Sequence, residues 1–228
     1  MVTTTSFQEA MEWAREVSGE LNVARVWIPE KAFVNAVREG ESISLTRSTP
    51  DGIFGLALGK DPILLPGWNE FALPQGSSPS LTDGMKFHDN WQTHAITTRS
   101  QSYEIEILED EDFVTAFLDA HAPKSSARPG NPEIELWGSV RNADGEIAAI
   151  AAISEWESGE KMLSSVGTHT QMRGQGFAQK VCAGLVGLAY DRGIERLNLV
   201  VLSSNTSAIS AYTKIGFQLV GKFASYTR

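Results

Sequence analysis

Residues 161–178, KMLSSVGTHTQMRGQGFA, read as the end of a strand, a glycine-rich turn and the first residues of a helix. Met162 and Val166 give the first part its apolar character, and apolar residues recur at helical spacing from Phe177 onward. A helix that begins on glycines leaves several backbone N–H groups unpaired at its N-terminus, where the helix dipole is positive. Because Arg173 adds a full charge at the rim, the turn is predicted to bind a phosphate or pyrophosphate.

Spacing separates three kinds of phosphate-binding turn. A Walker A loop needs a lysine followed by Ser or Thr, but Lys180 precedes a valine. A dinucleotide-binding turn needs a third glycine where Gln179 stands, and it normally opens a longer series of βαβ units. The third pattern, Q/R-x-x-G-x-G/A, is met by Gln171, Gly174 and Gly176. A turn that uses its glycines only for packing is the alternative that the residues leave open.

The composition excludes several classes of protein. Of the 228 residues, 42% are hydrophobic and 21% charged, as in an ordinary globular chain. A net charge of −9, with no cluster of basic residues, argues against nucleic-acid binding. The single cysteine excludes an intrachain disulfide, and the N-terminus lacks the pattern of a signal peptide. The longest apolar run, 147–153, is too short to cross a membrane as a helix, so we expect a cytoplasmic protein with no membrane partner.

The first hundred residues predict a small α/β region. Helices are expected over 6–19 and 30–38. Two strands, 42–47 and 52–58, follow, and a Pro-Asp-Gly turn joins them into a hairpin. Residues 65–84, rich in Pro, Gly and Ser, form the least regular segment, and loops of this length are usually functional or mobile.

Three aromatic residues in and beside this irregular segment, Trp68, Phe71 and Trp91, indicate that it is anchored to an apolar surface. His88 and His94 are six residues apart with no third ligand nearby, so neither is predicted to bind a metal. We therefore expect no catalytic or metal-binding group in the first half of the chain.

From about residue 101 the strands and helices become more regular. A strand is expected over 103–108, and the helix after it, 113–120, is preceded by the acidic run 109–112. Acidic residues at this position complement a helix N-terminus, which is the structural interpretation; a carboxylate site is the functional alternative. Residues 123–132 are predicted to form a stiff loop.

The remaining strands follow this loop. A hairpin is expected from strands 133–140 and 146–154, and the second of these is apolar on both faces and therefore central. A further strand, 196–202, precedes the last helix, and the chain is expected to close with two short strands, 218–221 and 223–226.

The segment after the strand 196–202 supplies a second group of candidate site residues. Ser203 or Asn205 can cap a helix that ends before Gly216. Asn205 and Tyr212 share one face of this helix. A phenol held in an apolar cleft can act as a proton donor, whereas the alternative is that Tyr212 only packs the helix onto the sheet.

Together, the glycine turn and this Asn–Tyr–Gly pattern resemble the two motifs of the GNAT superfamily of acyl-CoA N-acyltransferases. The resemblance implies an α/β fold with a mixed sheet: a GNAT domain over residues 101–228 and a smaller N-terminal α/β domain over residues 1–100. The N-terminal domain is either a degenerate half-copy of the same fold, as in two-domain members, or an unrelated lid. The second helix that usually walls the acceptor pocket is reduced to a short region here.

The resemblance also implies how a coenzyme binds. Acetyl-CoA is the expected cosubstrate, and its pantetheine arm pairs with the upstream strand as an added strand does. The amine attacks the thioester directly, a backbone N–H at Val166 or Gly167 polarises the carbonyl, and Tyr212 protonates the thiolate. The implied coenzyme-binding residues are Val166, Gly167, Thr168, Gln171, Arg173, Gly174, Gln175, Gly176, Phe177, Ala178, Asn205 and Tyr212.

A general base is harder to assign. Glu160 stands where the histone-acetylating branch of the family keeps a glutamate, and a regular strand would put it on one face with Val166. A single bulge would break that alignment, and Glu160 is otherwise a solvated carboxylate at a turn. The rival candidates are Glu155, Glu157, His169 and water. Cys182 is expected to be a small buried hydrophobe.

The predicted function is that of an N-acetyltransferase. It moves an acetyl group from acetyl-CoA to a primary amine of a small molecule or peptide, with no metal and no nucleic acid, as a monomer or homodimer. A non-catalytic acyl-CoA-binding or regulatory module is the alternative, and a nucleotide-binding oxidoreductase is a third class.

Overall fold

The computed structural model describes residues 1–19, 23–77, 84–100 and 105–228. They form two compact units. Unit 1 comprises residues 1–94, 200–205 and 219–228, and unit 2 comprises residues 95–199 and 206–218. The chain therefore leaves unit 1 and later returns to it. The division of the sequence into domains at residue 100 remains a proposal.

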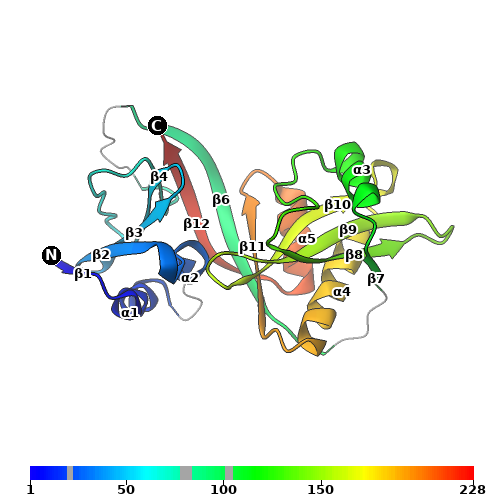
Figure 1. The fold of residues 1–228 in the computed structure, drawn as a ribbon, viewed down its shortest axis with the longest axis horizontal. Helices are drawn as coiled ribbons and strands as arrows, with labels where there is room; N and C mark the ends of the chain where they lie inside the picture. The colour runs from blue at the N-terminus through cyan, green and yellow to red at the C-terminus, as the bar shows by residue number, and fades with distance from the viewer. Residues whose placement is uncertain (20–22, 78–83, 101–104) are drawn as a thin grey trace. The chain divides into compact units, whose positions relative to one another are not determined.

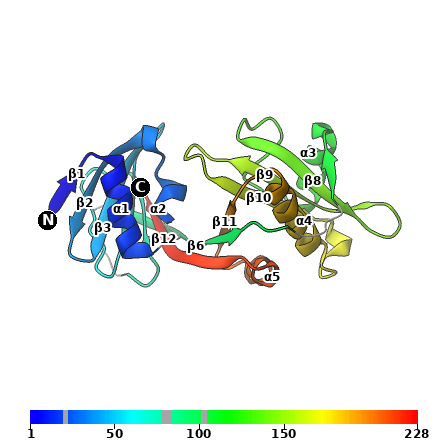
Figure 2. The same ribbon diagram turned by 90° about the horizontal axis from the view of Figure 1, so that it is seen from below.

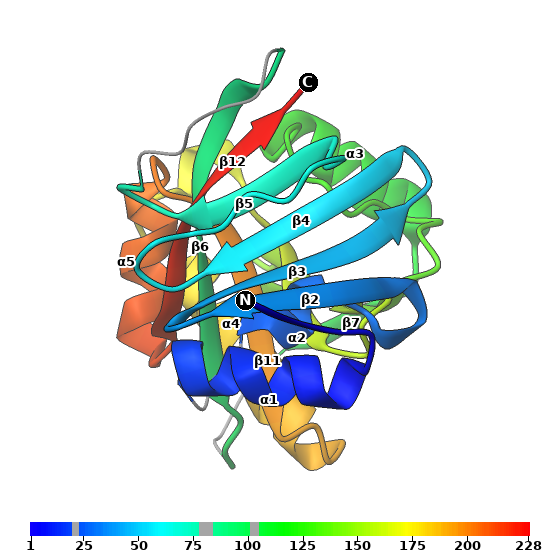
Figure 3. The ribbon, with the colours of Figure 1, turned by 90° about the vertical axis from the view of Figure 1, so that its left-hand side faces the viewer.

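The helical elements of unit 1 are α1 (Phe7–Ser18), α2 (Val23–Trp27) and the 3₁₀ turn η1 (Glu30–Ala32). Its strands are β1 (Val2–Thr4), β2 (Phe33–Glu39), β3 (Ser42–Thr49), β4 (Gly52–Leu58) and β5 (Glu70–Pro74), together with most of β6 (Lys86–Thr97) and of β12 (Gln218–Thr227). Within this unit the strand order is β1-β2-β3-β4-β5-β12-β6. Strands β1 to β4 are antiparallel neighbours, β5 is parallel to β4, and β12 is antiparallel to β5 (Figure 3).

The first predicted helix is confirmed as α1. The Ser6 side chain accepts a hydrogen bond from the Glu9 N–H (3.4 Å), and Gly19, with φ of 81°, ends the helix. The buried face of α1, with Ala10 and Met11, packs on the apolar face of β3 and β4. Local capping and the apolar stripe therefore agree with the tertiary packing.

The helix predicted over residues 30–38 is wrong. A single 3₁₀ turn, η1, is followed by strand β2, which pairs with β3 along its length, from Phe33 opposite Arg47 to Glu39 opposite Ser42. Gly40, with φ of 58°, makes the turn of this hairpin instead of ending a helix. Pairing with β3 thus outweighs the local helical spacing.

The hairpin predicted between residues 42 and 58 is confirmed as β3 and β4. The irregular segment that follows contains a strand, β5, which the sequence did not predict; its residues 78–83 lie outside the described part of the chain. Trp68, Phe71 and Trp91 are all buried, so the prediction that this segment is anchored to an apolar surface is confirmed.

The helical elements of unit 2 are α3 (Glu111–His121), α4 (Phe177–Asp191), α5 (Thr206–Ile215) and the 3₁₀ turn η2 (Thr170–Met172). Its strands are β7 (Glu106–Leu108), β8 (Ile134–Arg141), β9 (Ile147–Glu155), β10 (Lys161–Thr168) and the first part of β11 (Arg196–Leu202). The order in this unit is β6-β11-β10-β9-β8-β7, where β6 contributes its last residues. Strands β7 to β10 are antiparallel neighbours, and β11 is parallel to β10 (Figure 1).

Alternating side chains put α3 and α4 on opposite faces of this sheet. Trp137 and Ile150 pack with the apolar residues of α3. Gly138, the next residue of β8, faces the other side, where a Cβ atom would lie 2.8 Å from Leu185 of α4. Figure 2 shows α4 running across the strands on that side.

Most predictions for unit 2 are confirmed. The hairpin is β8 and β9, with β9 buried along nearly its whole length, and β11 has the predicted bounds. The strand expected over 103–108 is described from Glu106; residues 101–104 lie outside the described chain. At the acidic run, the Asp110 carboxylate accepts a hydrogen bond from the Phe113 N–H (2.9 Å) and caps α3, so the structural interpretation is confirmed.

The two short closing strands are wrong, because one strand, β12, spans Gln218–Thr227. The Lys222 carbonyl, at the expected break, accepts a hydrogen bond from the Gln75 N–H (2.9 Å). A Cβ atom at Gly221 would lie 2.5 Å from the Phe223 ring, so this glycine makes room for an aromatic ring and does not form a turn.

The mixed α/β architecture predicted from the sequence is confirmed. Among the described helices, none is both long enough and apolar enough to span a bilayer.

Candidate functional site

A β-bulge interrupts β10 in its second half. Ser165 and Val166 lie opposite a single residue of β9, Ala151. Ser165 has φ of 48° and is the one non-glycine residue in the left-handed region within the described chain. Such a conformation costs about 1–3 kcal/mol and persists only where its surroundings hold it. The bulge also breaks the regular alternation that would have placed Glu160 and Val166 on one face of the strand.

Beyond Met162, β10 has a free backbone edge on the side of β11. The two strands pair at Met162 opposite Asn198, and no further paired position between them occurs in the described residues. Backbone groups between residues 164 and 168 that point to this side can pair with an extended ligand. Val166, Gly167 and Thr168, predicted as coenzyme-binding residues, lie on this edge.

The glycine turn connects β10 to α4. Gly174 and Gly176 have φ of 77° and 84°, and a Cβ atom at either position would meet no atom within 4 Å. Both glycines therefore allow the left-handed backbone conformation of the turn, and the space beside them is open. The alternative that they serve packing is wrong. The Gln171 carbonyl accepts a hydrogen bond from the Gln175 side chain (3.4 Å) across this turn.

The N-terminus of α4 faces this open turn with unused donors. Gly176 is the N-cap residue, and no side chain caps it. The first helical hydrogen bond runs from the Lys180 N–H to the Gly176 carbonyl (3.0 Å), so the N–H groups of Phe177 and Ala178 have no acceptor within the helix. The first turn carries no acidic residue, and the Lys180 ammonium lies over the Phe177 ring. This end of α4 suits an anion.

Arg173 and His121 tie the turn to the end of α3. The Arg173 guanidinium donates a hydrogen bond to the His121 carbonyl (2.7 Å). Nδ1 of His121 accepts from the Thr170 N–H (3.3 Å), so it carries no proton. Burial, together with the positive charge of Arg173 and the neighbouring His169, lowers the pKa of His121. The positive charge of Arg173 is thus held at the rim of the turn.

Helix α5 carries the second group of predicted site residues. The prediction of this helix is confirmed. Asn205 lies directly before its first residue, and Gly216, with φ of 112°, lies directly after its last residue. Tyr212 is 8% exposed. Burial, and to a lesser extent the neighbouring Cys182, raises the pKa of the Tyr212 phenol, so the hydroxyl keeps its proton at neutral pH.

Cys182, on α4, is fully buried, and burial raises the pKa of its thiol. A protonated thiol without access to solvent is a poor nucleophile. The prediction that Cys182 is a small buried hydrophobe is confirmed.

Glu160 lies just before β10 and is bound to the neighbouring strand. Its carboxylate accepts a hydrogen bond from the side-chain amide of Asn198 (2.9 Å), a fully buried residue at the position where β10 and β11 pair. An extended strand places Val166 about 20 Å further along the chain. Glu160 is therefore separated from the bulge by most of the length of β10.

The other base candidates lie at the two ends of β10. Glu155 forms an ion pair with Lys161, which also pairs with Glu135. Glu157 is exposed in the turn between β9 and β10. His169 follows β10, and its buried Nδ1 has no hydrogen-bond partner in the described part of the protein. The acids thus gather at the start of β10, and His169 lies beside the glycine turn.

Sequence reasoning missed the contact of Ser165 with the loop between α3 and β8. Its hydroxyl donates a hydrogen bond to the Ala127 carbonyl (2.7 Å) and accepts one from the Ala127 N–H (3.2 Å). The one available signal is a polar pair, Ser164-Ser165, inside an otherwise apolar strand.

The sequence matches the profile described as the acetyltransferase (GNAT) family over residues 100–217, just over half of the chain. No protein of curated function has a sequence that matches this chain significantly.

Solved structures are similar to this chain over most of its length. A GCN5-related N-acetyltransferase from Sphaerobacter thermophilus is 14% identical, with a TM-score of 0.56 over 99% of this chain and 94% of that one. An acetyltransferase of the GNAT family from Colwellia psychrerythraea is 12% identical, with a TM-score of 0.55 over 99% of each chain. A GCN5-related N-acetyltransferase from Kribbella flavida is 15% identical, with a TM-score of 0.54 over 93% of this chain and 94% of that one. At these identities the similarity concerns the fold, and the fold class expected from the sequence is confirmed.

Proposed function

Since the chain belongs to the GNAT family of acetyltransferases, we propose that it moves an acetyl group from acetyl-CoA directly to a primary amine of a small molecule or peptide. One observation carries the coenzyme assignment. The uncapped N-terminus of α4 opens onto a glycine turn with empty space beside Gly174 and Gly176. Free N–H groups, a helix dipole and nearby cations are what a diphosphate requires.

The residues around this turn fit the coenzyme. N–H groups between Gly174 and Ala178 would hold the diphosphate, with the side chains of Gln171, Arg173 and Gln175 at the rim. The free edge of β10, residues 166–168, would pair with the pantetheine arm in place of a neighbouring strand. Asn205, at the start of α5, is proposed to bind the pantetheine region.

Acetyl-CoA, when bound, supplies a thioester whose carbonyl carbon accepts the amine nitrogen. The N–H of Val166 or Gly167, at the bulge, polarises that carbonyl as negative charge develops on its oxygen. Because the Cys182 thiol is buried and protonated, this cysteine does not take up the acetyl group. We therefore propose direct transfer to the amine.

Tyr212 is proposed to hold the proton that the departing thiolate needs. Its raised pKa keeps the phenol protonated until negative charge builds up on the sulfur. Proton donation from Tyr212 Oη to the sulfur then completes cleavage of the thioester.

The amine must lose a proton, and Glu160 is retained as the proposed acceptor. Because Glu160 is about 20 Å from Val166 along β10, it is proposed to act through a chain of water molecules and not by direct contact. Asn198 holds its carboxylate in place by a hydrogen bond of 2.9 Å. A Glu160→Gln variant should lower kcat most at low pH, where the amine is least often deprotonated; an unchanged pH profile would remove Glu160 from the mechanism.

The proposed function is tested with Tyr212→Phe in an assay of thiol release from acetyl-CoA in the presence of primary amines. We expect kcat to fall by about 10²-fold or more, because the proton donor is lost, while the acetyl-CoA Kd from calorimetry is unchanged. Tyr190→Phe is the matched control, since this tyrosine lies at the exposed end of α4. Equal turnover in the Tyr212→Phe and Tyr190→Phe variants would show that Tyr212 is not the acid.

The same measurements, with a parallel calorimetric titration of NAD(P), separate the competing functions. Binding of acetyl-CoA without amine-dependent thiol release from any of the amines would favour the acyl-CoA-binding module. Binding of NAD(P) in place of acetyl-CoA would favour an oxidoreductase.

A further inference from the structure

The last turn of α3 lies close against the end of β10. Gly167 of β10 makes this approach possible, because a Cβ atom there would lie 3.2 Å from the Ala122 side chain. The imidazole of His121, at the end of α3, meets that of His169, which follows β10, with ring centroids 4.1 Å apart. Two titratable rings from different elements are therefore in contact just before the glycine turn.

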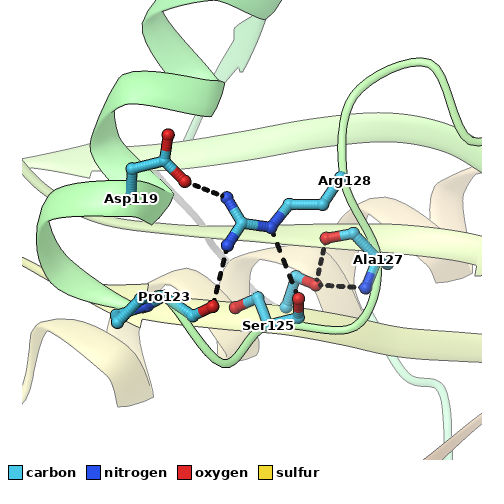
Figure 4. Close-up of polar contacts among 6 residues, drawn as sticks. Asp119, Pro123, Ser125, Ala127 and Arg128 are labelled. Carbon is cyan, nitrogen blue, oxygen red and sulfur yellow. Dashed lines mark hydrogen bonds and ion pairs between the residues drawn. The ribbon is translucent and has the colours of Figure 1, made fainter.

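Arg128 holds the last turn of α3 on both sides of His121. Its guanidinium pairs with the Asp119 carboxylate (2.7 Å) and donates to the Pro123 carbonyl (2.9 Å). Figure 4 shows the guanidinium between the helix and the loop that follows it. Because Asp119 precedes His121 and Pro123 follows it, this end of α3 is the fixed side of the contact with the turn.

His121 contacts the segment that leads into the glycine turn through its ring and its carbonyl. Nδ1 lies 2.9 Å from the Thr170 hydroxyl and accepts a hydrogen bond from the Thr170 N–H (3.3 Å). The His121 carbonyl accepts from the Arg173 guanidinium (2.7 Å). Since Arg173 directly precedes Gly174, these contacts fix the backbone just before the N–H groups that are proposed to hold the diphosphate.

Only a neutral His121 ring can make both contacts with Thr170. A proton on Nδ1 turns this acceptor into a donor. The protonated ring can still donate to the Thr170 hydroxyl, but it leaves the Thr170 N–H without its acceptor. Protonation of His121 thus removes one of the bonds that hold the turn.

A positive charge on His121 is also unfavourable where the ring lies. Among the described residues, the titratable groups that face it are His169, at the end of β10, and Arg173, in the turn. The Asp119 carboxylate, on the same helix, is bound to Arg128. Burial, and to a smaller extent the neighbouring His169 and Arg173, lower the pKa of His121. Protonation therefore sets the ring against residues on the other side of the contact.

We propose that His121 is a positioning residue that couples coenzyme binding to pH: the neutral ring holds the glycine turn in its binding conformation, and protonation releases the turn. The inference rests on the proposed function, which puts the coenzyme diphosphate at this turn. An added positive charge also attracts a diphosphate, but across water and dissolved ions this attraction is weak. Loss of the Thr170 bond and repulsion of Arg173 act on the turn itself, so acetyl-CoA affinity falls as the pH falls.

Two substitutions of His121 test this coupling by calorimetry between about pH 5.5 and 8, on both sides of the usual histidine pKa. His121→Asn keeps an acceptor close to the position of Nδ1 and cannot be protonated, whereas His121→Ala removes the acceptor. On acidification, the wild-type Kd for acetyl-CoA should rise about tenfold relative to that of His121→Asn. His121→Ala should bind about tenfold more weakly than the wild type at the alkaline end and equally at the acidic end.

The coenzyme itself carries a phosphate monoester that titrates near pH 6, so its charge also changes over this range. This contribution is common to all variants and cancels in the ratio of their Kd values. His88→Asn is the matched control, because His88 is an exposed histidine of unit 1, and its Kd profile should follow that of the wild type.

NMR titration of the wild type tests the same coupling without a substitution. If the neutral ring favours binding, saturating acetyl-CoA must lower the pKa of His121 further, because linkage is reciprocal. Direct attraction between the diphosphate and a protonated ring would instead raise that pKa. The ring-proton resonance of His121, followed against pH with and without acetyl-CoA, gives both values.

Two results overturn the proposal: parallel Kd profiles in the wild type and His121→Asn, or a His121 pKa that stays the same or rises on binding. Should His121→Asn fail to fold, the NMR titration decides alone. Failure of the proposed function is a separate outcome. A wild type that binds no acetyl-CoA even at the alkaline end removes the coenzyme site together with this inference, whereas binding there with no response to His121 removes only the inference.

Discussion

Units 1 and 2 follow the same order of strands, and they differ in the segment that connects the two parallel strands. In each unit a short strand is followed by a helix and then by three antiparallel strands. The third of these strands pairs in parallel with the next strand along the chain. The parallel pair is β4 with β5 in unit 1 and β10 with β11 in unit 2. The connection contains the glycine turn and α4 in unit 2, whereas residues 59–69 of unit 1 form no helix.

In unit 1, Trp68 occupies the position that the connecting helix α4 has in unit 2. Its indole N–H donates to the Thr46 hydroxyl (3.1 Å), and the ring lies directly on Gly55, where a Cβ atom would be 2.0 Å from it. Trp68 packs in a cluster with Phe71 and Leu73 on the face of the sheet opposite α1. Protein side chains therefore fill this face, whereas open space lies beside Gly174 and Gly176 of the glycine turn in unit 2.

The parallel strands also differ in how far they pair. β4 and β5 pair at three consecutive positions, from Phe54 opposite Glu70 to Leu56 opposite Ala72. β10 and β11 pair at one described position, Met162 opposite Asn198. The backbone edge that stays unpaired beyond Met162 in unit 2 is thus paired in unit 1.

Two units with the same order of strands can therefore differ in whether they offer a binding site. The connection between the parallel strands decides whether the edge is open and whether a helix N-terminus faces it. We interpret unit 1 as a degenerate half-copy of the fold of unit 2 that has lost the site. Three predictions test this interpretation.

The largest expected effect is on stability. Trp68→Ala should lower the free energy of unfolding by about 3–5 kcal/mol, because it empties a filled position in unit 1. The acetyl-CoA Kd of the folded protein should stay the same. Trp68→Phe, which keeps an aromatic ring but loses the indole N–H, should cost less. Denaturant unfolding and calorimetry measure both quantities, and weakened coenzyme binding in Trp68→Ala would mean that unit 1 contributes to the site.

A smaller effect, confined to ligand binding, is expected at the glycine turn. Gly176→Ala should weaken acetyl-CoA binding about tenfold to a hundredfold, since a methyl group enters the open space and the left-handed backbone is disfavoured. Gly145→Ala is a matched control, because Gly145 also has φ of 84° and no atom within 4 Å of its Cβ position. Both variants should lose about 1 kcal/mol of stability. Equal acetyl-CoA affinity in the Gly176→Ala and Gly145→Ala variants would show that the glycine turn does not bind the coenzyme.

The smallest effect concerns pH. Burial and the charge of Lys222 lower the pKa of His94 in unit 1, and burial, His169 and Arg173 lower that of His121 in unit 2. A histidine with a lowered pKa contributes stability above about pH 6.5 that is lost as the pH falls toward its folded-state value. The unfolding midpoint of the wild type should therefore decline below that pH.

Substitution of either histidine should make this decline shallower. His94→Asn should do so more than His121→Asn, because His94 is 3% exposed and His121 is only partly buried. Only His121→Asn should also flatten the pH dependence of acetyl-CoA affinity, since protonation of His121 breaks its hydrogen bond with Thr170. A flattened affinity profile in His94→Asn would contradict the separation of the two units.

Local signals made much of the fold predictable. Caps and glycine stops located α1 and α5, and turn residues located the hairpins of both units. The errors fall on β2, β5 and β12, three strands whose conformation depends on pairing with a neighbouring strand. A strand is stabilised by its neighbours, so its own residues are a weaker guide than those of a capped helix.

The sequence by itself determined the glycine turn, because Gly174 and Gly176 occupy backbone conformations that other residues adopt only at a cost. It also determined the helix that carries Tyr212, through the spacing of Asn205 and Gly216. Only the tertiary structure decided that Ser165 binds Ala127 and that the strand edge is paired with β5 in unit 1 and open beyond Met162 in unit 2. These contacts join residues far apart in the chain, and no local pattern specifies which of them will meet.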